Sequence, residues 1–105
     1  MKLSELKFVP CEKEPDVVSG EQAQKYLGEL KEWFLEENKI KKVFKFPDFK
    51  IAMHFVNEVA VIAERESHHP DIFISYNEVQ ITLWTHRVSG LSLNDFILAV
   101  KIDEV

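Results

Sequence analysis

The spacing of the apolar residues changes along the chain, and the change occurs at Pro70. Before it, apolar side chains recur every three or four residues over residues 48–67, which is the spacing of one buried helix face. After it, the runs "IFISY" and "VQITLWTH" alternate with period two, as half-buried strands do. A turn at Asn77 and Glu78 joins the two runs. The sequence therefore predicts a long helix followed by a strand hairpin.

Alternation along the second run sorts its side chains onto two faces of the predicted sheet. One face receives Val79, Ile81, Leu83 and Thr85, and the other receives Gln80, Thr82, Trp84 and His86.

The first half of the chain carries weaker signals of the same kind. Residues 1–18 contain two prolines and scattered charges, which predict an irregular leader. Ser19 and Gln22 match a capping box, so a helix is predicted at about 20–32. Residues 33–46, "WFLEENKIKKVFKF", predict two short strands joined through the polar "EENK".

A second capping box, Ser92 with Asp95, follows the turn at Gly90 and predicts a final helix. The element order is then α-β-β-α-β-β-α. This order indicates an α+β fold, in which three helices pack on one face of a four-stranded antiparallel sheet. The opposite face of the sheet stays open to solvent, a ligand or a second subunit.

Composition limits the classes of protein that the chain can belong to. With 105 residues, the chain is expected to form one domain, residues 1–105. No apolar run reaches the ~18 residues that cross a bilayer, and the start "MKLSELKFVP" lacks the apolar core of a signal peptide. We therefore expect a cytoplasmic protein without a membrane span. Asp and Glu outnumber Lys and Arg by 18 to 13, which argues against direct nucleic-acid binding.

Three of the four histidines stand in one segment: His68, His69 and His86. The pair lies at the corner between the predicted helix and hairpin, and Pro70 holds the backbone of His69 extended. Because the hairpin returns the chain, antiparallel pairing would bring His86 close to this corner.

Three interpretations of the cluster compete. The histidines can be polar surface residues at strand ends. They can bind a metal, but adjacent histidines on extended backbone point to opposite sides, and Cys11 is the only cysteine. They can transfer protons to and from a bound small molecule, since histidine titrates near neutrality. Asp95 can start the final helix and also orient a nearby histidine, so its two roles are compatible.

The segment "ESHHPDIFISYNEVQITLWTHRVSGLSLND" resembles the signature of the pterin-4a-carbinolamine dehydratases. That pattern is His-His-Pro, five residues, an aromatic residue, nine residues, His, about eight residues and Asp. His68, His69, Pro70, Tyr76, His86 and Asp95 meet it here. The resemblance continues through "AERESHHP", "FKFPDF" and Trp33 into the leader, which is similar to members from plants and some bacteria.

The resemblance implies dehydration of 4a-hydroxytetrahydrobiopterin to quinonoid dihydropterin and water, in the recycling of tetrahydrobiopterin. No further cofactor and no metal are implied. It implies that His68 and His86 are the general acid and base, that His69 positions the substrate, and that Asp95 orients a histidine. It also implies a substrate-binding set on two segments: Ser67, His68, His69 and Pro70, and Trp84, Thr85 and His86.

One position departs from the family, because the residue at Trp84 is usually small. A large ring there can stack on the pterin, narrow the pocket or cover the open sheet face, and the sequence does not choose among these.

Other roles are compatible with the same resemblance. Family members form homodimers or homotetramers, and some animal members act as dimerisation cofactors of a homeodomain transcription factor. A non-catalytic pterin-binding or scaffold role, or a role in molybdopterin metabolism, is therefore the alternative to tetrahydrobiopterin recycling.

Overall fold

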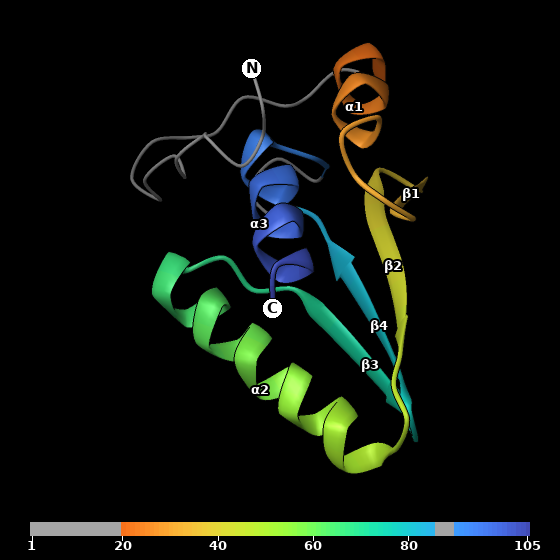
Figure 1. Cartoon of the computed structure of the whole chain (residues 1–105). Coiled ribbons are helices and arrows are strands. Elements are labelled where there is room, and N and C mark those ends of the chain that lie inside the picture. The colour runs from red at the N-terminus through yellow and green to blue at the C-terminus, as the bar shows by residue number, and fades with distance from the viewer. Residues whose placement is uncertain (1–19, 86–89) are drawn as a thin grey trace.

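The computed structural model describes residues 20–85 and 90–105. The described elements follow the predicted order: α1 (Gly20–Leu27), β1 (Phe34–Glu36), β2 (Lys39–Lys45), α2 (Phe49–Glu66), β3 (Asp71–Ser75), β4 (Glu78–Leu83) and α3 (Leu93–Asp103). All strand pairs are antiparallel, and the order across the sheet is β1-β2-β4-β3. Figure 1 shows α2 and α3 lying along the same side of the sheet. The predicted α+β fold is therefore confirmed.

The core lies between the sheet and these helices. Register places Ile81 of β4 between Lys42 of β2 and Ile72 of β3, so these three side chains share the covered face. Val79, Ile81 and Leu83 are fully buried, as the predicted alternation requires. The buried apolar cluster also takes residues from every helix: Ala23, Ala52, Phe55, Val59, Phe96, Leu98, Ala99 and Ile102.

Helix α2 confirms the prediction for residues 48–67 nearly to the residue. The Asp48 carboxylate caps its start by accepting the Ile51 backbone N–H at 2.9 Å. One stripe of the helix is buried, and Phe55 of that stripe packs against the rings of Phe44 and Phe46, at centroid distances of 4.7 and 5.0 Å. The helix ends at Ser67, which takes the left-handed conformation with φ of 52°.

Helix α1 is shorter than predicted. It ends at Leu27, where Gly28 follows, and the predicted helix at 20–32 is wrong for residues 28–32. The N–H groups of Glu29 and Leu30 bond three residues back instead of four, which tightens the chain into turns. Glycine has a high entropic cost in a helix, so it favours this early end. The proposed cap Ser19 lies outside the described residues.

Both hairpins use two-residue loops. Glu37 and Asn38 join β1 to β2 with φ of 50° and 61°, the positive values of a type I′ turn. The second loop is Tyr76 and Asn77, one residue earlier than predicted. The Asn77 side-chain amide donates to the Phe46 carbonyl at 2.9 Å, which ties the hairpin loop to the end of β2.

Strand β4 ends before the predicted run does. Beyond Leu83, Thr85 pairs again in a short antiparallel bridge with Gly90. Among residues 20–85 and 90–105, no helix is long and apolar enough to span a membrane.

Candidate active site

The corner between α2 and β3 carries the neighbouring histidines, as the sequence predicts. The backbone N–H groups of Ser67 and His68 bond to the carbonyls of Glu64 and Ala63, at 3.3 and 3.1 Å. These bonds satisfy two carbonyls of the last helical turn and close the helix before Pro70. The left-handed Ser67 then redirects the chain into β3, so that the His68 side chain turns toward α3.

His68 reaches a buried carboxylate there. Its Nε2 lies 2.6 Å from Oδ1 of Asp95, and its side chain is 12% exposed while that of Asp95 is fully buried. Asp95 stands in the first turn of α3, where the positive end of the helix dipole favours a negative charge. The predicted proximity of Asp95 to a histidine is thus present for His68.

The second oxygen of Asp95 is held by two other donors. The Thr85 hydroxyl donates to Oδ2 at 2.8 Å, and the Ser92 backbone N–H donates to the same atom at 2.9 Å. The hydroxyls of Thr85 and Ser92 lie 2.7 Å apart. Three segments therefore hold the carboxylate: the corner after α2, the end of the hairpin and the start of α3.

This contact fits one tautomer of His68 when Asp95 is ionised. An ionised carboxylate only accepts hydrogen bonds, so Nε2 of His68 must be the donor to Asp95. In that tautomer the Nε2 proton is engaged by Asp95, and Nδ1 is the acceptor nitrogen of the ring. A histidine oriented in this way by a carboxylate is suited to general acid–base catalysis.

His69 turns to a different carboxylate. Its Nε2 lies 3.0 Å from Oε1 of Glu64 on α2, and both side chains are exposed, at 63% and 80%. The adjacent histidines therefore contact different carboxylates.

Trp84 is fixed by two contacts that the sequence did not indicate. Its indole N–H donates to Oδ2 of Asp71 at 3.0 Å. The ammonium group of Lys39 lies 4.6 Å from the centre of the ring, within the range of a cation–π interaction. These contacts link the end of the hairpin to the start of β3, next to the histidine corner.

The remaining predicted site residues fall into two groups. Ser67 is exposed and Pro70 is half-buried at the corner, while Thr85 is buried with its hydroxyl on Asp95. His86 lies outside the described residues, so its proximity to His68 stays a prediction. Ser92 was predicted only as a helix cap, and its bond to Thr85 required the hairpin to dock on α3.

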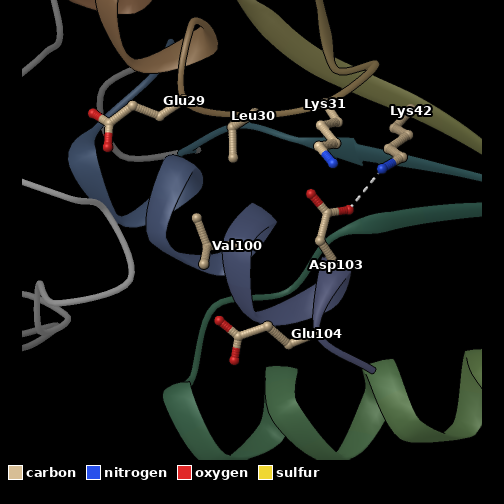
Figure 2. Close-up of a pocket in the computed structure, with 7 residues that line it drawn as sticks. All are labelled: Glu29, Leu30, Lys31, Lys42, Val100, Asp103 and Glu104. Carbon is tan, nitrogen blue, oxygen red and sulfur yellow. Dashed lines mark hydrogen bonds and ion pairs between the residues drawn. The ribbon is translucent and has the colours of Figure 1, made fainter.

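A hollow of about 310 Å³ lies away from this cluster. Figure 2 shows it at the carboxyl end of α3, where Asp103 binds Lys42 at 2.8 Å. The Trp33 indole N–H donates to the second oxygen of Asp103 at 2.9 Å. Asp95 and Asp103 are eight residues apart, or about 12 Å along a helix axis, so the hollow and the histidine corner are distinct sites.

Comparisons with known proteins agree on one family. The protein-family model described as pterin 4 alpha carbinolamine dehydratase matches residues 16–105 of this chain. A protein of Rickettsia canadensis is 44% identical over 103 residues, which cover 96% of this chain and 94% of that protein. A protein of Alkaliphilus metalliredigens is 38% identical over 104 residues, which cover 97% of this chain and 94% of that protein. Both carry the name pterin-4-alpha-carbinolamine dehydratase provisionally.

A solved structure supports the same grouping. The transcriptional coactivator/pterin dehydratase of Brucella melitensis superposes with a TM-score of 0.82 and 32% identity. The match covers 85% of this chain and 97% of that one.

Asp95 and Glu64 each contact a histidine, so removing each carboxylate shows how much it contributes to the free energy of unfolding. Asp95→Ala is expected to lower the free energy of unfolding by about 2–4 kcal/mol, because it leaves buried donors without an acceptor. Glu64→Ala removes an exposed pair and is expected to cost only about 0–1 kcal/mol. Urea unfolding followed by circular dichroism measures both. Equal losses in the two variants would contradict the buried network.

Proposed function

Because the chain belongs to the pterin-4a-carbinolamine dehydratase family, we propose that it dehydrates 4a-hydroxytetrahydrobiopterin to quinonoid dihydropterin and water. This reaction recycles tetrahydrobiopterin. The observation that carries the proposal is the 2.6 Å contact between His68 and Asp95, because it supplies an oriented proton-transfer group at the corner where the family signature lies.

The reaction needs one proton given and one proton taken. The bond between C4a and the hydroxyl oxygen breaks, and a general acid protonates the leaving oxygen to give water. A general base removes the proton on N5, and the electron pair of the broken N5–H bond forms the new C4a–N5 double bond. Atoms and charge balance without an oxidant, a reductant or a further cofactor.

Two histidines on different sides of the pterin can perform these two transfers. We assign them to His68 and His86, and general acid–base groups of this kind typically contribute about 10²–10⁴-fold each. His68 acts through its Nδ1, since Asp95 holds its Nε2. His69 then binds and positions the substrate, and Asp95 orients His68.

The proposed substrate-binding set is carried over from the family resemblance. The corner residues Ser67, His68, His69 and Pro70 form one side of the proposed site, and Trp84, Thr85 and His86 form the other. The contacts of Trp84 with Asp71 and Lys39 hold its ring at this end of the hairpin. We propose that the indole borders the pterin, which distinguishes this chain from relatives with a small residue there.

The printed name of the Brucella melitensis structure includes transcriptional coactivator as well as pterin dehydratase. A binding role without catalysis is therefore the second candidate, and a role in molybdopterin metabolism is the third. Turnover of chemically prepared 4a-carbinolamine separates these candidates, because neither alternative predicts dehydration of that compound.

The catalytic assignment predicts the effect of removing each imidazole. His68→Ala and His86→Ala are each expected to lower turnover of the carbinolamine by at least roughly tenfold, because each removes one proton-transfer group. His54→Ala is the matched control, since His54 is an exposed histidine on α2. The measurement is a coupled spectrophotometric assay. Wild-type turnover in both site variants would make the assignment wrong and favour a binding role.

Self-association as a homodimer or homotetramer stays a prediction. It is supported by the face of the sheet opposite the helices, where Val43 is 40% and Phe73 is 65% exposed. Light scattering at micromolar concentration is expected to give two or four times the mass of the chain. A monomer would contradict this prediction.

A further inference from the structure

The hydrogen bonds around Asp95 have a single consistent direction. The Thr85 hydroxyl has one proton, and it donates that proton to Oδ2 of Asp95. In its contact with Ser92 the Thr85 oxygen must then accept, so the Ser92 hydroxyl is the donor. The order is Ser92 to Thr85 to Asp95, with His68 donating to the other carboxylate oxygen.

This chain of groups is enclosed. Ser92 and Asp95 are fully buried and Thr85 is 7% exposed. In the described part of the chain, every buried side-chain nitrogen and oxygen has a hydrogen-bond partner. Water therefore competes little with these bonds, and breaking one leaves a buried polar group unsatisfied.

A helix cap alone does not account for the arrangement. A capping box needs Asp95 to accept the Ser92 backbone N–H, and that bond is present. Thr85 lies outside the capping box, ten residues before Asp95, and adds a second donor to the same oxygen. With Oδ2 held by two donors, rotation of the carboxylate would break both bonds. Oδ1 is therefore directed at His68.

We propose that Thr85 and Ser92 are positioning residues that act on His68 through Asp95, keeping its imidazole in the Nε2–H tautomer and in one orientation. The family resemblance assigned Thr85 to substrate binding, whereas its hydroxyl donates to Asp95 and so takes the positioning role. The kinetic consequence rests on the proposed function, whereas the tautomer of His68 can be measured without it.

Four variants isolate the hydroxyls. Thr85→Val removes the Thr85 hydroxyl and keeps the shape of the side chain, and Thr85→Ser keeps the hydroxyl. Ser92→Ala removes the first donor of the chain. Thr82→Val is the matched control, because Thr82 lies on β4, is 8% exposed and makes none of the described bonds to Asp95.

The first readout is the tautomer of His68, measured from the imidazole ¹⁵N chemical shifts of the full-length protein at a pH where the ring is neutral. Wild type, Thr85→Ser and Thr82→Val are expected to show Nε2–H alone. Thr85→Val and Ser92→Ala are expected to show a mixture with the Nδ1–H form. A structural role in helix capping would lower stability without changing the tautomer.

The second readout is steady-state kinetics with the carbinolamine. Thr85→Val is expected to lower kcat by about tenfold with KM changed less than about twofold, because the imidazole loses its alignment. Thr85→Ser is expected to restore kcat to within about threefold of wild type. Thr82→Val is expected to match wild type.

The outcomes separate this inference from the proposed function. An unchanged tautomer in Thr85→Val and Ser92→Ala would overturn the inference even if the enzyme is active. An Nδ1–H tautomer in the wild type would overturn it without any variant, so failure of a variant to fold leaves it testable. A wild type that does not turn over the carbinolamine would overturn the proposed function, while the ¹⁵N comparison would still decide the positioning role.

Discussion

The hydrogen bond from His68 to Asp95 joins two parts of the chain that are 27 residues apart. A buried carboxylate is costly unless donors replace the water it loses. Here the donors come from the corner after α2, from the end of the hairpin and from the start of α3. The carboxylate is satisfied only when all three segments are in place. The same requirement that closes the fold therefore orients the histidine.

Local backbone structure directs these segments toward Asp95. The left-handed Ser67 ends α2 and redirects the chain so that His68 faces α3. The two-residue loop at Tyr76 and Asn77 sets the register of the hairpin, which determines that Thr85 emerges on the covered face. Because these features fix backbone direction, the site depends on turns as much as on its polar side chains. The pair of His69 and Glu64, by contrast, is exposed, at 63% and 80%.

Sequence patterns predicted the parts of this architecture that have strong local signals. The apolar stripe and the cap at Asp48 identified α2, and period-two alternation placed Thr85 on the same face as Leu83. Pro70 and the Ser92 capping box indicated where the corner and α3 begin. The resemblance to the family signature then implied that His68 and Asp95 belong to one site.

The missed features arise from contacts between distant segments or from weak local preferences. The end of α1 at Gly28 was missed because the apolar residues Leu27 and Leu30 keep helical spacing across the glycine. The bond between Thr85 and Ser92 required the docking of the hairpin on α3, which no local pattern encodes. The contacts of Lys39 and Asp71 with Trp84 likewise join separate strands, so no local pattern predicts them.

We propose that His68, aligned by Asp95, and His86 face one bound pterin from different sides. A crystal structure with 7,8-dihydrobiopterin, which resembles the substrate but lacks the 4a-hydroxyl, tests it most directly. We expect the pterin ring to lie within hydrogen-bond reach, about 3 Å, of Nδ1 of His68 and of the His86 ring, with the bond from His68 to Asp95 intact. A pterin bound elsewhere, or a His86 ring pointing away from the ligand, would contradict it.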